Sequence, residues 1–584
     1  MTRWPAVPNA VLLAVVLGLA ACGGEGGPEG VVMSSDPFCR DVLPRVDAFM
    51  AQARVDHPTP ADERYGGTVV LGNIGELTDG MNSAVTSSYY PRAHQIYLNL
   101  MPLIRYDEET VPQPYLAESW EVSPDNTEIT FHIRRDVFWH DGEQTTAHDV
   151  AFTYRTVTNP ETAFPLSAYV EHYDKREGGV EVVDDFTVKV RLNPHSEFLD
   201  FWTLVGILPE HLLAEVPPAK LKQHPYGSQC PVGNGPFVFS SHQPQDRWVF
   251  TANPAYPKAL GGRPFLDRYI YRIIPEQTTL LAELLIEEVD VYIRPRTDQA
   301  RRISEAEDVD LLSFPWREYA FVAWNARKPQ LSDARVRRAI TLGTNRAEIT
   351  QAMLQGYGTV SNSGVPPFHW AFDPDVHEQD GYDPDAAMAL LDDAGWMDRD
   401  GDGVRENADG LPLSFSIKSN TGNQQRQDVA EIMQSQLAEI GMEVRPQLVE
   451  MASMLLQINS PDLRDFDGVA ISAIEPFRLD HTDRFHSASS GEPWAYAGTN
   501  NPQIDELLEK LSTTVDREEA RPMWAEYQRV IAQEAPYTYF YFPDGLAGVN
   551  KRLKGVIMDA RGELVSIRDW YIDPASETQG RSGG

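Results

Sequence analysis

Two His-Asp pairs lie close together in the sequence, at His140-Asp141 and His148-Asp149. Histidine nitrogens and carboxylate oxygens are common metal ligands, so the pairs could belong to a metal-dependent hydrolase of the HD type. Such a site needs ligands that converge from several helices, whereas both pairs lie on one connection from a strand through a turn to a helix. A hydrolase is therefore a distant alternative, and we expect His140 and His148 to be surface residues.

A second group of potential metal ligands consists of Asp398, Asp400, Asp402 and Asp409. Their spacing follows the D-x-D-x-D-G pattern of calcium loops, which supply oxygen ligands around a glycine turn and have an acidic residue at position twelve. Two features weaken the match: position twelve is the shorter Asp, and the residues that follow predict a strand instead of a helix. A structural calcium site and a polar connecting loop remain alternatives. The sequence requires no other cofactor.

The three cysteines have different settings. Cys22 follows Leu-Ala-Ala and an apolar run at residues 10–19 that is too short to span a membrane comfortably. The arrangement resembles a bacterial lipobox and predicts a signal peptide at residues 1–21, a lipid on Cys22 and a glycine-rich tether after it. An ordinary signal peptide that releases the protein is the alternative. Cys39 and Cys230 would then lie outside the cytoplasm, where they either form a disulfide or remain separate thiols.

The composition is that of a large, folded and acidic protein. The chain has 584 residues, of which 42% are hydrophobic, enough for several cores. Asp and Glu outnumber Lys and Arg by 86 to 50, and the formal net charge of −36 would repel nucleic acids and anionic membrane surfaces. We therefore expect no nucleic-acid partner, and no segment after the N-terminal run reaches the length of a membrane span.

The clearest secondary-structure signals flank the two His-Asp pairs. Residues 116–122 and 128–133 alternate apolar and polar positions around a Ser-Pro-Asp-Asn turn and predict a β-hairpin. Thr145 or Thr146 is expected to cap the helix that follows.

Two further segments also indicate structure. An apolar stripe over residues 41–54 predicts an extra helix ahead of the main body. Gly233 and Gly235 precede a strand at residues 237–239. They favour a tight turn with positive φ over a phosphate-binding loop, because no helix N-terminus follows them.

Several of these stretches together resemble a known family. They are LAESW at 116–120, the Pro-Asp-Asn turn, FHIRRDVFWHDG at 131–142 and T-A-x-D-V-x-F-T-Y at 146–154. In these residues the chain is similar to the family 5 extracellular solute-binding proteins, the peptide- and nickel-binding components of ABC importers. The resemblance continues over residues 66 to 575. Within it, Asp141-Gly142 is a turn and Asp149 belongs to a helix start.

The resemblance implies an α/β fold of the periplasmic-binding-protein type, with two lobes, a hinge and an extra subdomain inserted in the first lobe. The hinge is expected where the chain crosses between the lobes, near residues 312 and 540. The implied parts are the tether and extra helix at 22–64, lobe I at 65–93, 229–312 and 540–575, the inserted subdomain at 94–228, lobe II at 313–539 and a disordered tail at 576–584.

The resemblance also implies a function. The protein would be a receptor outside the cytoplasm that holds a small solute between its lobes and presents it to the permease subunits of an ABC importer, without catalysis. A peptide is the leading ligand, and sugars, opines and metal chelates are the alternatives. A sensor or chaperone that uses the same cleft to signal is the alternative function. We expect a monomer that is attached to the cell membrane only by its lipid.

Peptide binders of the family hold the peptide ammonium with an Asp that follows a Gly-Trp pair. Here Ser472-Ala473 replaces that pair, and Pro476 falls at or next to the Asp position. Glu475 would substitute with a shift of one residue, or it is a solvated loop carboxylate. Phe321 lies on an alternating strand and is expected to be part of the core. Other candidate ligand-binding residues near the expected cleft edges are Tyr89, Tyr90, Tyr319, Ser472 and Trp494.

Overall fold

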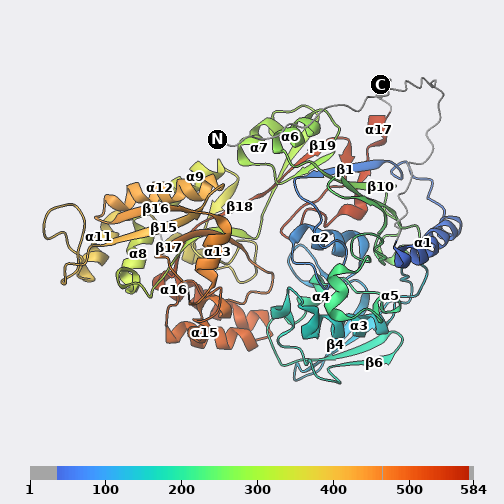
Figure 1. Ribbon diagram of the computed structural model, residues 1–584, viewed down its shortest axis with the longest axis horizontal. Helices are drawn as coiled ribbons and strands as arrows, with labels where there is room; N and C mark the ends of the chain where they lie inside the picture. The colour runs from blue at the N-terminus through green and yellow to red at the C-terminus, as the bar shows by residue number, and fades with distance from the viewer. Residues whose placement is uncertain (1–35, 380, 463, 578–584) are drawn as a thin grey trace, which may run out of the picture. The chain divides into compact units, whose positions relative to one another are not determined.

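The computed structural model describes residues 36–379, 381–462 and 464–577 (Figure 1). The predicted signal peptide, Cys22 and the glycine-rich tether lie outside the described residues, as does most of the predicted tail. The first two residues of that tail end a short helix, α17 (Pro574–Glu577). In the described ranges, no helix is both long and apolar enough to cross a membrane.

Lobe I is built on a seven-stranded sheet of order β12-β19-β11-β1-β10-β9-β8. β1 runs parallel to β10 and β11, and the other neighbours are antiparallel. Successive residues of β1 point to opposite faces: Val69 and Leu71 enter one core, and Val70 packs with α6 and α7 on the other side. The elements are β1 (Thr68–Asn73), α2 (Tyr89–His94), β8 (Phe237–Gln243), β9 (Arg247–Ala252), β10 (Arg268–Ile273), α6 (Gln277–Leu285), β11 (Val291–Ile293), α7 (Thr297–Ser304), β12 (Val309–Phe314) and β19 (Gly545–Asn550).

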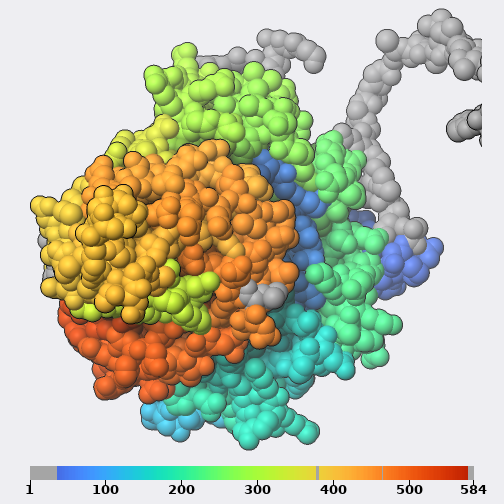
Figure 2. All heavy atoms as spheres, turned by 60° about the vertical axis from the view of Figure 1, so that its left-hand side comes forward, coloured from blue at the N-terminus to red at the C-terminus, as the bar shows by residue number. Residues whose placement is uncertain are grey.

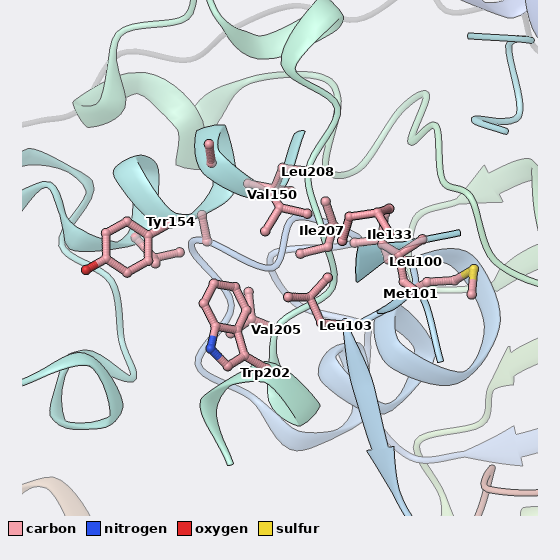
Figure 3. Close-up of a cluster of buried hydrophobic side chains, with 14 of the residues drawn as sticks. Leu100, Met101, Leu103, Ile133, Val150, Tyr154, Trp202, Val205, Ile207 and Leu208 are labelled. Carbon is pink, nitrogen blue, oxygen red and sulfur yellow. The ribbon is translucent and has the colours of Figure 1, made fainter. Parts of the chain in front are cut away.

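The inserted subdomain contains a four-stranded antiparallel sheet of order β4-β5-β7-β6. The predicted hairpin is confirmed as β4 and β5, and it buries alternate residues of β5. Figure 3 shows side chains of this subdomain, among them Tyr154 and Trp202, gathered into one buried cluster. The elements are β4 (Ala117–Val122), β5 (Glu128–Ile133), α3 (Ala147–Thr158), β6 (Val180–Asp184), β7 (Thr187–Arg191), α4 (Phe201–Leu204) and α5 (Glu210–Leu213).

The connection that carries the two His-Asp pairs folds as a turn and a helix start. Gly142 has a φ of 96°, and Thr146 caps α3 in a capping box in which Asp149 accepts a hydrogen bond from the Thr146 amide at 2.9 Å. His148 is exposed, as predicted.

The prediction that His140 is a surface residue is wrong. His140 is 1% exposed, its Nδ1 accepts a hydrogen bond from the Gly233 amide at 3.2 Å, and its Nε2 lies 3.0 Å from the Gly235 carbonyl oxygen. Burial lowers its pKa to about 4. The loop at Gly233 and Gly235, which is remote in sequence, covers the ring, and no local pattern reveals that cover.

The loop itself also differs from expectation. Neither Gly233 nor Gly235 has a positive φ. Glycine is required there by close approach, since a Cβ on Gly233 would lie 1.7 Å from the Asn99 carbonyl oxygen and one on Gly235 would lie 2.5 Å from that of Leu98.

Lobe II is built on a six-stranded sheet of order β14-β18-β13-β17-β15-β16, with helices on both faces. Phe321 of β13 is 2% exposed and lies in the core between the sheet and α13 to α16, which confirms the core assignment. The strands are β13 (Glu318–Trp324), β14 (Gly358–Val360), β15 (Ser414–Asn420), β16 (Glu443–Val449), β17 (Gly468–Ile474) and β18 (Tyr537–Pro543). The helices are α8 (Ala334–Leu342), α9 (Arg346–Leu354), α10 (Pro374–Gln379), α11 (Pro384–Asp393), α12 (Gln424–Ala438), α13 (Met451–Asn459), α14 (Thr482–Phe485), α15 (Pro502–Thr513) and α16 (Arg517–Glu534).

The chain crosses between the two large sheets twice. The first crossover lies between β12, which ends at Phe314, and β13, which begins at Glu318, and the second lies at Asp544 between β18 and β19. Both crossovers lie a few residues after the positions expected near 312 and 540, because β12 and β18 continue further than the resemblance implied.

The predicted extra helix is α1 (Pro37–Asp56), which Asp36 caps by accepting a hydrogen bond from the Phe38 amide at 2.9 Å. One apolar face of α1 packs on the core of the inserted subdomain. Cys39, on the same face, forms a disulfide with Cys230, and their Cα atoms are 5.5 Å apart. Of the two alternatives for these cysteines, a disulfide or separate thiols, the structure has the disulfide.

Candidate functional site

A cavity of about 600 Å³ lies where lobe I, the inserted subdomain and lobe II meet. Its volume is within the roughly 300–1,000 Å³ that is usual for small-ligand sites. The lining residues used below are Tyr89, Arg92, Ala93, Ile96, Arg105, Tyr106, Asp107, Gln113, Tyr115, Tyr169, Arg317, Phe477, Ile557, Arg561, Arg568 and Asp569.

The wall from lobe I is one face of α2 and of the π-helical turn Gln95–Asn99 that continues it. Tyr89, Arg92, Ala93 and Ile96 line the cavity at intervals of three, four and seven residues. Residues at those intervals share one face of a helix, so a single short element places an aromatic ring and a guanidinium side by side.

The wall from lobe II comes from the ends of two strands. Phe477 follows β17 and packs edge-on against Tyr106 of β2 (Ile104–Tyr106), with ring centroids 5.3 Å apart. Arg317, in the first crossover, lies with its guanidinium carbon 4.4 Å from the centre of the Phe477 ring. Phe477 thus joins the two lobes beside the cavity.

Five arginines and two aspartates line the cavity, and three of these seven groups are in ion pairs. Arg561 pairs with Asp559, which lies outside the lining, and Arg568 pairs with Asp569. Asp107 accepts hydrogen bonds from the Glu109 and Val111 amides and from the Gln113 side chain. Of the two lining carboxylates, Asp569 is held in an ion pair, whereas Asp107 keeps its negative charge and has hydrogen bonds to both oxygens.

The three remaining arginines, Arg92, Arg105 and Arg317, have no ion pair among the described residues. Arg105 is exposed, and its guanidinium carbon lies 5.2 Å from the centre of the Tyr115 ring. Arg92 is half-buried. Its pKa is lowered by burial and by the positive charge of Arg317, while the Tyr169 hydroxyl acts in the opposite direction.

Of the predicted ligand-binding residues, Tyr89 lines the cavity. Its hydroxyl donates a hydrogen bond to Glu563 at 2.5 Å, and Glu563 accepts another from Arg294 at 2.8 Å. The guanidinium carbon of Arg294 lies 4.7 Å from the centre of the Tyr89 ring. These contacts fix the position of the ring in the cavity wall.

The predicted ligand carboxylate, Glu475, does not line the cavity. It is fully buried, 2.6 Å from Nη1 of Arg484 and 3.4 Å from Nε2 of His481. Burial alone would raise its pKa, but the positive charge of Arg484 holds the pKa at about 2. Its charge is balanced by Arg484 within lobe II, so Glu475 stabilises the lobe and does not face a ligand.

The other predicted residues are dispersed. Tyr319 is 1% exposed and accepts a hydrogen bond from Arg484 at 2.9 Å inside the core of lobe II. Ser472 accepts one from Arg426 at 3.0 Å. Tyr90 packs beside Tyr89 without lining the cavity, and Trp494 is 52% exposed away from it.

The inserted subdomain and lobe II also touch outside the cavity. Arg517, the first residue of α16, donates two hydrogen bonds to Glu197 at 2.7 and 2.8 Å. The Ser196 amide donates to the Ser512 carbonyl oxygen at 2.8 Å. Figure 2 shows this side, where orange-red atoms of lobe II meet the blue-green atoms of the inserted subdomain. The lobes are therefore in contact across the site.

A cluster of His172, His195 and Asp480 belongs to the same contact. The two imidazole rings are stacked with centroids 3.4 Å apart, and Nε2 of His195 lies 3.9 Å from Asp480. Stacked rings direct their nitrogens side by side instead of toward one point, and Arg478 already pairs with Asp480 at 3.0 Å. We assign this cluster to the contact between lobes and not to a metal.

The structure brings together a different donor set from the one predicted for the calcium loop. Oxygen atoms of Asp398, Asp400 and Glu406 lie within 4.8 Å of one another, while Asp402 and Asp409 are outside that group. Glu406 was missed because its interval differs from that of the calcium-loop pattern. Calcium binding in this loop stays a prediction.

Comparison with known proteins gives a consistent result. A family model described as "Bacterial extracellular solute-binding proteins, family 5 Middle" matches residues 111–470. The oligopeptide-binding protein AppA of Bacillus subtilis is 29% identical over 524 residues, which are 87% of this chain and 92% of AppA.

Solved structures agree. That of AppA from Bacillus subtilis in complex with a nonapeptide has a TM-score of 0.71 at 28% identity, covering 87% of this chain and 99% of that one. NikZ from Campylobacter jejuni in complex with Ni(L-His) has a TM-score of 0.70 at 25% identity, covering 86% and 99%.

Proposed function

Because the chain belongs to the bacterial extracellular solute-binding proteins of family 5, we propose that it is the receptor of an ABC importer and captures a peptide in the cavity between its lobes. The observation that supports this best is the lining of the cavity, to which lobe I, the inserted subdomain and lobe II all contribute. The peptide class is supported by the relatives, since AppA is an oligopeptide-binding protein and was solved with a nonapeptide.

Capture needs no bond to be made or broken. The two walls stand on either side of the chain crossovers at residues 315–317 and 544, so a ligand that touches both walls binds the closed arrangement better than an open one. The closed form is then the species that the permease subunits recognise.

Delivery to a permease requires the receptor to stay near the membrane. A lipid on Cys22 would supply this anchor, on the argument of the lipobox-like sequence before it. We expect Cys22→Ser to move the protein from the membrane fraction to the soluble fraction. Continued membrane association of this variant, with no acylated peptide found by mass spectrometry, would rule the anchor out.

The central experiment identifies the ligand and the site together. Full-length untagged protein is purified in detergent, its bound small molecules are identified by mass spectrometry, and a panel of peptides is screened by thermal shift. We expect a peptide to co-purify or to raise the melting temperature.

Two matched variants locate the binding. Ile557 lines the cavity and is 59% exposed, whereas Ile286 is 67% exposed at the end of α6. Ile557→Trp should reduce the ligand-induced shift by placing a large ring at the cavity, and Ile286→Trp should leave it unchanged. Equal shifts in both variants would mean that the ligand binds elsewhere.

A further inference from the structure

Most of the cavity charges that lack a partner of opposite charge are positive. Arg92, Arg105 and Arg317 lack an acidic partner in the described part of the chain, while Asp107 and Asp569 are both occupied by donors of the protein itself. The whole chain carries a net charge of −36, so the sign of the charge in this site is opposite to that of the protein as a whole. Asp107 is the one lining carboxylate without a basic partner in the described chain, and both of its oxygens already accept hydrogen bonds from the protein.

Two of these arginines face the cavity from opposite lobes. Arg92 belongs to α2 in lobe I and donates to the Ser87 carbonyl oxygen at 3.1 Å. Arg317 stands in the crossover to lobe II and donates to the carbonyl oxygens of Ala560 and Glu475, each at 3.1 Å. A guanidinium has five N–H donors, so both keep donors for a ligand, and neutral carbonyl groups leave their charges unbalanced.

The repulsion between these two charges acts across the site. Both guanidinium groups line the same cavity, and the positive charge of Arg317 adds to the effect of burial in lowering the pKa of Arg92. Bringing the lobes together without a counter-charge therefore costs free energy. An anion in the cavity would remove this cost and hold both walls.

We propose that the captured peptide is an anion without a free ammonium group, and that Arg92 and Arg317 together bind its carboxylate. This inference rests on the proposed function and specifies the ligand class of the same cavity. The planar fork of a guanidinium matches both oxygens of a carboxylate, and Tyr89, Tyr169 and Phe477 provide aromatic surface for the apolar part of the ligand.

Four probes of equal length test the charge requirement by calorimetry on the full-length protein. They are N-acetyl-tyrosyl-asparagine with a free C-terminal carboxylate, N-acetyl-tyrosyl-aspartate amide with only a side-chain carboxylate, the neutral N-acetyl-tyrosyl-asparagine amide, and tyrosyl-asparagine amide with a free ammonium. We expect one or both acids to bind at least tenfold more tightly than the neutral probe, and the ammonium probe to bind more weakly than the neutral one. The better acid shows whether a terminal or a side-chain carboxylate is recognised.

Three variants assign the effect to the two arginines. Arg92→Gln and Arg317→Gln should each weaken binding of the better acid about tenfold, while Arg301→Gln, on the exposed surface of α7, should not. The melting temperature without ligand should be unchanged or higher in Arg92→Gln, because a repulsion is removed. A purely structural role for Arg92 would instead lower it.

The outcomes separate this inference from the proposed function. Tighter binding of the ammonium probe, or undiminished binding of the acids by both variants, would overturn the anionic class and leave solute capture intact. If no probe binds, the molecule found by mass spectrometry decides: an anion supports the inference, and a neutral or cationic molecule refutes it. Absence of any bound or binding solute would refute both.

Discussion

At the scale of single residues, the lobe II wall of the cavity depends on an ion pair that the ligand does not touch. Glu475 is fully buried, and Arg484 connects it to Tyr319. The backbone amide of Glu475 also donates to the carbonyl oxygen of Arg317 at 2.9 Å. The carboxylate therefore supports the strand ends from which Arg317 and Phe477 reach the cavity.

We expect Glu475→Gln to lower the free energy of unfolding by about 3 kcal/mol, because Arg484 would be left buried without a counter-charge. Ligand affinity should change little in the protein that remains folded. Chemical denaturation and calorimetry measure the two effects. Glu492→Gln, at an exposed position of the same lobe, is the control, and the double variant Glu475→Gln/Arg484→Gln should recover part of the loss. A large loss of affinity with normal stability would restore Glu475 as a ligand residue.

Buried histidines should make the protein acid-sensitive. His94 is fully buried, with Nδ1 2.7 Å from the Tyr90 carbonyl oxygen and Nε2 2.8 Å from the Tyr269 hydroxyl, and burial lowers its pKa to about 4. In the unfolded chain the pKa is about 6.5. Below that pH the unfolded state binds a proton that the folded state does not bind. The free energy of unfolding is therefore highest above pH 6.5 and falls as the pH is lowered toward 4.

His94 alone accounts for about 3 kcal/mol of this loss. Denaturation measured from pH 4 to pH 7 should give a smaller pH slope for His94→Gln than for the native chain, whatever its absolute stability. His148→Gln, at an exposed position, should keep the native slope. Identical slopes for all three proteins would show that His94 does not contribute.

The acidic loop offers a test between two donor sets. If calcium binds at the group seen in the structure, Asp400→Asn should weaken it strongly and Asp409→Asn should not, whereas a twelve-residue loop would lose affinity with either change. Calorimetry with Ca²⁺, and melting with and without a chelator, distinguish the two cases. If neither heat nor a change in melting temperature is found, the calcium prediction is wrong.

Single residues differ in how far sequence alone could place them. Arg92 was within reach, because it follows Tyr89 at the interval that puts both on one helical face. Arg317 and Phe477 were not, because they meet only through the pairing of β13 with β17, which are remote from each other in sequence. Glu475 was misplaced because its partner, Arg484, marks no recognisable pattern.

At the scale of elements, α16 fastens lobe II to the inserted subdomain through Arg517 and Glu197, which are 24% and 10% exposed. This pair forms only when the lobes are in contact. We expect Glu197→Gln to speed ligand release and weaken affinity about fivefold, as is reasonable for a partly buried, doubly hydrogen-bonded ion pair.

Stopped-flow release and calorimetry measure these quantities. The matched control is Glu305→Gln, which removes the partner of Arg301 on the exposed surface of α7 and should change neither. Unchanged release from Glu197→Gln would show that this contact does not contribute to closure.

The helix α1 depends on its disulfide. Cys39 and Cys230 are 191 residues apart in sequence, so the bond removes much conformational freedom from the unfolded chain. Replacing both by serine should lower the free energy of unfolding by roughly 4 kcal/mol, and reduction of the native protein should have the same effect. Alkylation of the denatured, non-reduced protein should find neither thiol free. Two reactive thiols would contradict the bond.

Elements with local signals were predictable. The hairpin β4–β5, the cap at Thr146 and the stripe of α1 all depend on neighbours within a few residues. The loop at Gly233 was predicted as a turn because its glycines were expected to have positive φ. They are instead required because the backbone of Leu98 and Asn99, more than a hundred residues away in sequence, leaves no room for a Cβ.

At the scale of the whole molecule, the two crossovers that separate the lobes lie against each other. Ser313, at the end of β12, donates a hydrogen bond to Asp544 at 2.6 Å, and so links the two connecting segments. Motion of one lobe must therefore bend both segments together. The order of the lobes along the chain could be predicted from the family resemblance. The unpaired charges of Arg92 and Arg317 could not, because these residues come together only in the folded protein.

The disulfide of α1 has a mechanical consequence. A force applied to the chain ahead of Asp36 enters the described structure at the first turn of α1, and Cys39 lies in that turn. The load then passes through the covalent bond to Cys230 and on to β8, instead of along the helix. The side-chain packing of α1 therefore does not carry this force, which would otherwise separate the helix from the core one turn at a time. The receptor can be held by its amino-terminal end without this helix being peeled from the body.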